Sequence, residues 1–218
     1  YEESGTPGYL FGDLYDFFID NDHLYFVIGD VSGKGVPASL FMAITRSLFR
    51  TLSQHVLSPA KIVTEMNNSI SDNNESNMFV TLIVGILDLE TGILKLCNAG
   101  HNPPILIYPD GQVSYLEFKT QIFVGVVEDF KYSDEEVVLE KESKLFLYTD
   151  GVTEAENINK ELYGEEKLLE MLSDNASSDV RTTVNVVVDS IASHVKEAEA
   201  SDDLTILLIQ YEPGTANS

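Results

Sequence analysis

Cysteine and basic residues are scarce in this chain of 218 residues, and each shortage excludes a class of function. Cys97 is the only cysteine, which excludes an intramolecular disulfide and a zinc site built on cysteines. The 13 lysines and arginines stand against 36 aspartates and glutamates, so the formal net charge is -23. A field of this sign repels nucleic acid and anionic membrane surfaces. Most of the acidity is expected to be solvated surface, which leaves a minority of carboxylates to hold cations.

Targeting segments and long hydrophobic runs are also lacking. The most apolar stretch, residues 79–87, is too short to cross a bilayer. No charged-then-apolar leader opens the chain, so there is no sign of a secretory signal. Together with the single cysteine, these absences predict a cytoplasmic protein without membrane contact. The chain begins with Tyr1, which suggests a fragment or a processed product, from which targeting information can be missing.

The apolar pattern predicts strands in the middle of the chain and helices near both ends. The hydrophobic share of 44% is enough for a buried core. Helices are expected with Pro37 and Pro59 in their first turns and over 165–173 and 180–196, and strands over 24–29, 79–87, 93–99, 104–109, 112–118, 136–140, 144–148 and 204–211. Short turn signals between neighbouring strands favour antiparallel sheets and the α+β class. No linker divides the chain, so we expect one domain over 1–212 and a disordered tail over 213–218.

The segment IGDVSGKGVP, residues 28–37, resembles a phosphate-binding loop because it combines three glycines with Lys34. A P-loop requires G-x-x-x-x-G-K followed by Ser or Thr. Gly29 and Gly33 are one residue too close for that pattern, and Gly35 follows the lysine. The dinucleotide fingerprint G-x-G-x-x-G fails as well. We therefore interpret the loop by its aspartate rather than by its glycines and lysine.

Five aspartates stand at strand ends or in turn-like motifs. Asp30 and Asp150 each follow an apolar strand directly and enter a glycine-containing turn, and Asp13, Asp16 and Asp202 lie in GDLYDFF and SDDLTILL. Carboxylates brought together resist joint ionisation, and a divalent cation removes that conflict. Oxygen ligands alone favour Mg²⁺ and Mn²⁺ over zinc. Any one of these aspartates is more often only a turn residue, so the prediction of a metal site depends on their combination.

A family resemblance rests on five motifs in order: GDLYDFF, IGDVSGKGVPASLFMA, NAGHNPP, LYTDGVTEA and SDDLTIL. In this order they resemble the PPM-type metal-dependent serine/threonine phosphatases, especially the bacterial RsbU and stage II sporulation protein E-like branch. The match runs from about residue 10 to residue 211. It implies a four-layer α-β-β-α sandwich whose two central antiparallel sheets hold two divalent cations, Mn²⁺ or Mg²⁺, at one edge.

The resemblance also implies roles for individual residues. Asp30 corresponds to the carboxylate that bridges both cations, and Val31 lends a backbone carbonyl to one of them. Asp150 and Asp202 correspond to ligands of the other cation, and Asp13 to an accessory acidic residue beside the pair. The expected catalytic set is therefore Asp30, Asp150 and Asp202.

Three further residues are expected around this set. Asp203 would orient its neighbours, and Lys34 would steady a phosphoryl oxygen. His101 either assists proton transfer and water positioning or only forms local hydrogen bonds. Ser32 stands where eukaryotic members have a histidine thought to protonate the leaving oxygen, so the general acid is unassigned. The phosphate-binding arginine of those members has no counterpart near the first motif.

The implied function is a phosphoprotein phosphatase that hydrolyses phosphoserine or phosphothreonine with a metal-activated water. In the bacterial branch the domain usually follows a sensor domain, acts on an anti-sigma-factor antagonist and commonly dimerises. We therefore expect such a phosphoprotein substrate, an upstream sensor domain or regulator, and leave a homodimer open. The alternative is a catalytically weak module that binds a partner through the same acidic groove. The joint presence of Asp30, Asp150 and Asp202 favours the enzyme.

Overall fold

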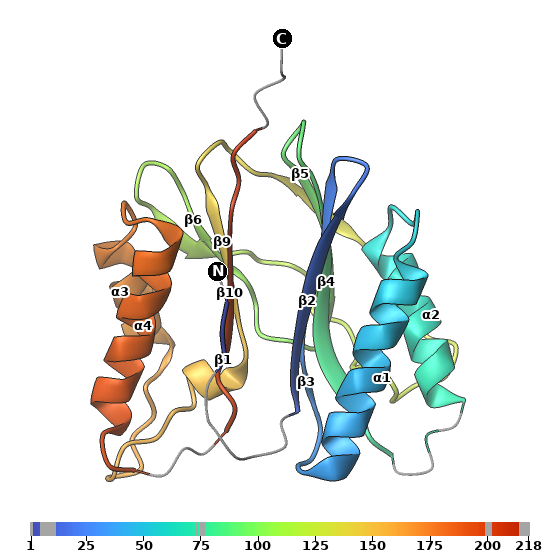
Figure 1. The fold of residues 1–218 in the computed structure, drawn as a ribbon, viewed down its shortest axis with the longest axis horizontal. Helices are drawn as coiled ribbons and strands as arrows, with labels where there is room; N and C mark the ends of the chain where they lie inside the picture. The colour runs from blue at the N-terminus through green and yellow to red at the C-terminus, as the bar shows by residue number, and fades with distance from the viewer. Residues whose placement is uncertain (1, 5–11, 73, 75–76, 199–201, 214–218) are drawn as a thin grey trace. The chain divides into compact units, whose positions relative to one another are not determined.

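The computed structural model describes residues 2–4, 12–72, 74, 77–198 and 202–213. The chain divides into two compact units. Unit 1 comprises residues 1–7, 102–117 and 140–211, and unit 2 comprises residues 8–101, 118–139 and 212–218. Each unit contains one five-stranded antiparallel sheet and two α-helices (Figure 1). The predicted α+β class with two antiparallel sheets is confirmed.

Unit 2 is built on the sheet β2-β3-β4-β5-β8. Its strands are β2 (Asp13–Asp20), β3 (His23–Val31), β4 (Val80–Asp88), β5 (Ile93–Ala99) and β8 (Glu135–Val138), and its helices are α1 (Val36–Leu52) and α2 (Pro59–Ser71). Helix α2 begins where predicted, because the Ser58 hydroxyl accepts a hydrogen bond from the Lys61 N–H at 3.3 Å and proline occupies the first turn. The predictions missed strand β2.

The core of unit 2 lies between one face of this sheet and the two helices. Strand side chains alternate between faces. Alternate residues of β3 and β4 join residues of α1 and α2 in one apolar cluster, which includes Val27, Val31, Leu82, Val84, Phe49, Ile62 and Met66. By the same alternation Asp13, Asp30 and Thr81, which are aligned on β2, β3 and β4, belong to the opposite face. These three polar side chains therefore lie on the face of the sheet that α1 and α2 do not cover.

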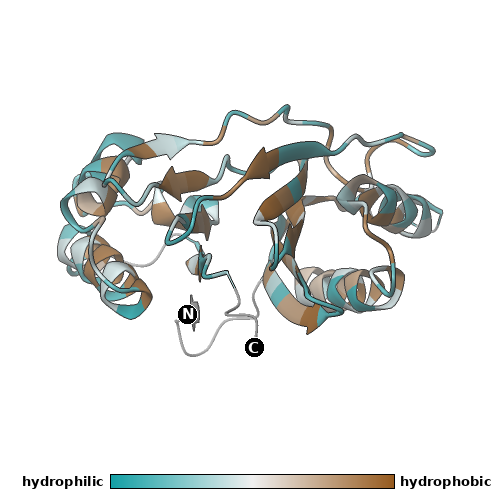
Figure 2. Ribbon diagram, turned by 90° about the horizontal axis from the view of Figure 1, so that it is seen from above, coloured by the Kyte–Doolittle hydropathy of each residue, from teal (hydrophilic) through white to brown (hydrophobic). Residues whose placement is uncertain are grey.

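Unit 1 is built on the sheet β1-β10-β9-β6-β7. Its strands are β1 (Glu2–Ser4), β6 (Ile105–Ile107), β7 (Val113–Tyr115), β9 (Lys144–Tyr148) and β10 (Thr205–Gln210), and its helices are α3 (Glu165–Asp174), α4 (Val180–Val195) and the 3-10 helix η1 (Asp150–Val152). The apolar cluster joins β9 and β10 to α3 and α4 through residues such as Phe146, Leu208, Leu168 and Val187. Figure 2 shows hydrophobic residues concentrated in the strands. No helix of the described residues is long and apolar enough to span a membrane.

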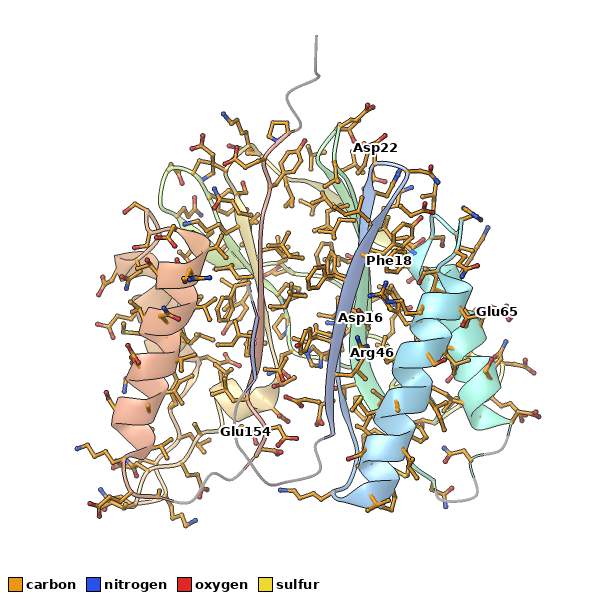
Figure 3. All side chains as sticks on the ribbon, viewed as in Figure 1. Asp16, Phe18, Asp22, Arg46, Glu65 and Glu154 are labelled. Atoms are coloured by element: carbon orange, nitrogen blue, oxygen red, sulfur yellow. The ribbon has the colours of Figure 1, made fainter. Side chains whose placement is uncertain are left out.

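Asp16 is a buried carboxylate on the helix-facing side of β2. It accepts hydrogen bonds from Arg50 Nε and Nη2 at 2.6 and 2.5 Å and from Arg46 Nε at 3.2 Å. Arg50 also donates to the Phe17 carbonyl at 2.9 Å and lies over the Phe18 ring (Figure 3 labels Asp16, Phe18 and Arg46). Burial alone would raise the pKa of Asp16, but the hydrogen bonds and charges of the two arginines outweigh it and lower the pKa.

We expect Asp16→Asn to lower the free energy of unfolding by about 2 kcal/mol at neutral pH, less than for a fully buried pair because both arginines are half-exposed. The folded pKa lies below the ordinary value of about 3.9, so the stabilisation is present above that value and is lost as the pH falls through the folded pKa. Urea unfolding of parent and variant at about pH 7 and about pH 3 measures both effects. An unchanged difference at the lower pH would contradict the assignment.

Candidate active site

Asp13 and Asp30 are direct cross-strand neighbours where β2 begins and β3 ends. Residues directly opposite each other in an antiparallel pair have Cβ atoms about 4.5–5.5 Å apart. Both side chains are partly exposed. The structure therefore brings together, within unit 2, the residue predicted to bridge the cations and the predicted accessory residue.

Gly12 leaves a space open beside two predicted ligand atoms. A Cβ on Gly12 would lie 3.0 Å from the Val31 carbonyl oxygen and 3.1 Å from Asp30 Oδ1. The Val31 N–H also donates to the Gly12 carbonyl at 3.2 Å, which fixes this approach of the two chain segments. The Val31 carbonyl oxygen and Asp30 Oδ1 are both of the kind that hard cations prefer. They border a small space that any side chain at position 12 would fill. The two donors are thus of the type that suits a divalent cation, and their role as ligands stays a prediction.

The loop from β3 into α1 carries Lys34. Gly33 and Gly35, on either side of it, have φ of +92° and +78°, a backbone conformation that favours glycine. Ser32 fastens the loop to the start of β4, because its N–H donates to the Phe79 carbonyl at 2.9 Å and its hydroxyl accepts from the Phe79 N–H at 2.8 Å. Lys34 is exposed, and its role toward a substrate stays a prediction.

Asp150 and Asp202 lie on adjoining segments of unit 1. Asp150 follows β9 and Asp202 precedes β10, and these strands pair antiparallel. A Cβ on Gly151 would lie 1.7 Å from the Asp203 carbonyl oxygen, so the two segments are in close contact at these residues. The Asp203 N–H donates to Asp202 Oδ1 at 2.9 Å. The backbone of Asp203 thereby orients the neighbouring carboxylate.

Glu154 is an acidic residue near this pair that the sequence predictions did not include. It follows η1 (Figure 3), and its N–H donates to the Asp150 carbonyl at 2.7 Å. Partial burial raises the pKa of the Glu154 carboxyl, and the negative charges of Asp150 and Asp202 raise it further. Negative charge is therefore concentrated at this end of unit 1, and a bound cation would relieve it. The motif DGVTEA, which places an acid four residues after Asp150, was the available signal.

An open cavity of about 750 Å³ adjoins Glu154 in unit 1. Its lining consists of Thr153, Glu154, Leu162, Tyr163, Gly164, Glu165, Glu166, Lys167 and Glu170. Four of these residues are glutamates and one is a lysine, so the cavity is acidic. A cavity of about 680 Å³ in unit 2 lies instead at the ends of α1 and α2, with a mostly apolar lining that includes Leu52, Val56 and Ile62.

The predicted ligands fall into two sets, Asp13 with Asp30 in unit 2 and Asp150 with Asp202 in unit 1. Over the described ranges, no three or more His, Cys, Asp and Glu side chains form a group that could hold a metal ion. The ligand roles therefore stay predictions. His101 is buried in unit 2 beside Thr81, the cross-strand partner of Asp30.

Arg46 and Arg50 do not supply the missing phosphate-binding arginine beside Asp30. Both are bound to Asp16, which alternates to the opposite face of β2 from Asp13. The guanidinium groups are therefore tied to the helix-facing side of the sheet.

Comparison with known proteins identifies relatives over nearly the whole chain. The family model for Stage II sporulation protein E (SpoIIE) matches residues 20–212. The chain is 28% identical over 226 residues to protein IcfG of Synechocystis sp. and 26% identical over 200 residues to phosphoserine phosphatase RsbU of Bacillus subtilis. Each alignment covers 91% of this chain, but only 35% of IcfG and 59% of RsbU. The chain thus spans between about a third and three fifths of these relatives.

Solved structures share the fold. The SiaA-PP2C domain of Pseudomonas aeruginosa has a TM-score of 0.86 at 21% identity, with 97% of this chain and 85% of that chain covered. RsbX, solved in complex with magnesium, has a TM-score of 0.70 at 19% identity, with 96% and 92% covered. These likenesses confirm the predicted phosphatase-type fold class. With the family model matched over 193 of 218 positions (residues 20–212), the chain belongs to the Stage II sporulation protein E (SpoIIE) family.

Proposed function

We propose that the chain is a metal-dependent phosphoprotein phosphatase that hydrolyses phosphoserine or phosphothreonine. The observation that carries the proposal is the placement of acidic motif residues in a member of the SpoIIE family: Asp30 is paired with Asp13, and Asp150 adjoins Asp202. A family relative, RsbU, is a phosphoserine phosphatase. A module that only binds a partner has no need of four carboxylates placed in this way.

The donor set suits two hard divalent cations, Mn²⁺ or Mg²⁺, because all its ligand atoms are oxygens. In this proposal Asp30 would help to hold both cations, and the Val31 carbonyl would help to hold one of them. Asp150 and Asp202 would help to hold the other, and Asp13 would be accessory. Such cations, when bound, neutralise phosphoryl oxygens and lower the pKa of water. The related RsbX was solved with magnesium.

In this proposal, several residues of the chain position the cation ligands or the substrate. Gly12 keeps the space beside Asp30 and Val31 open, and the Asp203 N–H orients the Asp202 carboxylate. Lys34 attracts the negatively charged substrate and steadies one phosphoryl oxygen from the surface. No nucleophilic side chain is required, which agrees with the raised pKa, about 12, of the buried Cys97 thiol.

The proposed substrate of this chain, which we place in the cytoplasm, is a serine- or threonine-phosphorylated anti-sigma-factor antagonist. The proposed regulator is an upstream sensor domain or another upstream regulator. Both proposals derive from the family resemblance. To test them, the purified chain with Mn²⁺ is incubated with phosphorylated antagonist-like proteins from the same genome, and phosphate release is measured beside hydrolysis of p-nitrophenyl phosphate. Release from an antagonist by the parent supports the proposal. Absence of activity on both kinds of substrate would refute the phosphatase.

Lys34→Ala is expected to lower the rate of hydrolysis less than tenfold. An exposed point charge that assists one phosphoryl oxygen is worth roughly 1 kcal/mol, because water screens it. Neither parent nor variant should bind ATP in calorimetric titration, since the loop departs from the P-loop pattern. Micromolar ATP binding by the parent that disappears in Lys34→Ala would restore the nucleotide-loop interpretation.

A further inference from the structure

Within unit 2, a row of three hydrogen-bonding groups consists of the His101 ring, the Thr81 hydroxyl and the backbone carbonyl of Asp30. Thr81 is the direct cross-strand partner of Asp30, so both side chains lie on the same face of the sheet. Thr81 Oγ1 lies 3.4 Å from the Asp30 carbonyl oxygen and 3.0 Å from His101 Nδ1. Thr81 therefore connects the motif NAGHNPP with the loop that carries the proposed shared ligand.

His101 is held firmly at its end of this row. One side chain satisfies both polar groups of its backbone: Asn98 Nδ2 donates to the His101 carbonyl at 3.0 Å, and the His101 N–H donates to Asn98 Oδ1 at 2.8 Å. The Phe123 ring occupies the place that a side chain on Gly100 would take. The side chain of His101 is only 4% exposed. Its ring is therefore presented to Thr81 with little freedom to turn away.

The direction of donation along the row follows from the chemistry of its groups. A carbonyl oxygen only accepts, so the Thr81 hydroxyl uses its single hydrogen toward the Asp30 carbonyl. The Thr81 oxygen then acts as an acceptor toward His101, and Nδ1 of His101 must carry a hydrogen. In the neutral ring, Nε2 is consequently the nitrogen that carries no hydrogen.

We propose that His101 is held as the Nδ1–H tautomer and that, through Thr81, it positions the peptide group between Asp30 and Val31. The carbonyl of this peptide group faces Thr81, and its N–H donates to Gly12 at 3.2 Å. Both polar groups of one peptide unit are thus fixed, one from β4 and the other from the residue before β2. His101 and Thr81 are positioning residues, because they act through this backbone.

The position of that peptide group matters for the proposed cation site. The Asp30 carboxylate and the Val31 carbonyl, both proposed ligands, are attached on its two sides. A rotation of the peptide plane would move both oxygens relative to the space beside Gly12. Removal of a group that orients a metal ligand in this way typically weakens metal affinity by roughly 10–100-fold. This part of the inference rests on the proposed function, whereas the tautomer does not.

The tautomer is tested directly by NMR of the protein labelled with ¹⁵N-histidine, at a pH where the ring is neutral. The chain has four histidines, and the signals lost in His101→Asn identify those of His101. We expect a protonated Nδ1 and an unprotonated Nε2. The opposite tautomer would mean that Thr81 donates to the ring instead of to Asp30, and would overturn the proposal whatever the activity of the protein.

The positioning role is tested by two pairs of variants. The amide of Asn places a donor near the position of His Nδ1, whereas the amide of Gln places one near Nε2. We expect His101→Asn to bind Mn²⁺ within about threefold of the parent and His101→Gln to bind it about tenfold more weakly. Likewise Thr81→Ser should retain Mn²⁺ affinity and Thr81→Val, which has the same shape without the hydroxyl, should lose about tenfold. Calorimetric titration with Mn²⁺ alone measures each value, and urea unfolding confirms that each variant is folded.

The outcomes separate this inference from the proposed function. Equal Mn²⁺ affinities for His101→Asn and His101→Gln, or for Thr81→Ser and Thr81→Val, would refute the positioning role. A parent that binds Mn²⁺ with the expected variant pattern but hydrolyses no phosphate ester would refute the phosphatase and leave the positioning role supported. A parent that binds no Mn²⁺ refutes both the cation site and the positioning role, and the NMR result then decides the tautomer alone.

Discussion

Excess chelator is expected to abolish phosphate release by the parent protein, and added Mn²⁺ or Mg²⁺ is expected to restore it. A phosphoryl group in transfer carries negative charge that some positive group must stabilise. Arg46 and Arg50, two of the three arginines, are tied to Asp16. Lys34 is exposed and can contribute only a screened charge. The proposed cations are therefore the main source of positive charge available to the reaction.

The measurement is steady-state hydrolysis of p-nitrophenyl phosphate with Mn²⁺, then with chelator, then with excess Mn²⁺ or Mg²⁺ added back. Urea unfolding in chelator is the control, because a lost cation site must be distinguished from a lost fold. A ligand that binds only the folded state stabilises it by RT ln(1 + L/Kd), where L is the free ligand concentration, so Mn²⁺ should also raise the unfolding midpoint. Undiminished turnover in excess chelator, with the protein folded, would refute metal dependence.

Local sequence patterns predicted most elements of the fold, and the exceptions have physical causes. Strand β2 was missed because Asp16 occupies a core-facing position, which destroys the expected alternation of apolar and polar residues. The arginines that make its burial tolerable follow 30 and 34 residues later, beyond the range of any local pattern. Helix α2, in contrast, was predicted because its start depends only on Ser58 and Pro59.

Two strands of unit 1 are only about half as long as predicted, whereas β10 (Thr205–Gln210) loses one residue at each end. Residues 104–109 yield only β6 (Ile105–Ile107), and residues 112–118 yield only β7 (Val113–Tyr115). Pro104 and Pro109 flank the first of these, and proline has no N–H to donate to a neighbouring strand. Outside β6 and β7 the two segments are still joined by hydrogen bonds from the Tyr108 N–H to the Gln112 carbonyl and from the Leu116 N–H to the Pro104 carbonyl, each at 2.8 Å, so the apolar pattern overestimates the regular strands but not the hairpin.

The sequence named candidate residues for the site but not the contacts between them. The motifs indicated Asp13 and Asp30 as candidate site residues. Their alignment across β2 and β3 depends on the register of β2, the strand that was missed. The sequence left two interpretations of His101 open. Its hydrogen bond to Thr81 joins residues 20 positions apart. Thr81 in turn meets Asp30, 51 positions away, only through the pairing of β3 with β4. Long-range pairing is the information that a reading of motifs lacks.

Asp30→Asn is expected to lower phosphate release by a factor on the order of 10³ or more, which corresponds to about 4 kcal/mol of activation free energy. Asp30 is the only proposed ligand shared by two cations, and Asn preserves the shape of the side chain while removing its charge. We expect the fold to be retained, because two hydrogen bonds at this position involve the backbone and persist in the variant: Thr81 donates to the Asp30 carbonyl, and the Val31 N–H donates to Gly12. An unchanged midpoint in urea unfolding would verify this.

Asp22→Asn is the matched control for this loss. Asp22 lies in the turn at the other end of the β2–β3 hairpin (Figure 3), where its φ of +61° suits asparagine as well as aspartate. The control makes the same chemical change and the same change in net charge, on the same pair of strands, away from the proposed ligands. We expect its activity to stay within about twofold of the parent, since a surface charge at that distance is screened by salt. If Asp30→Asn were also only a few-fold less active, Asp30 could not be the ligand that both cations share, because loss of its charge would then leave the proposed site intact.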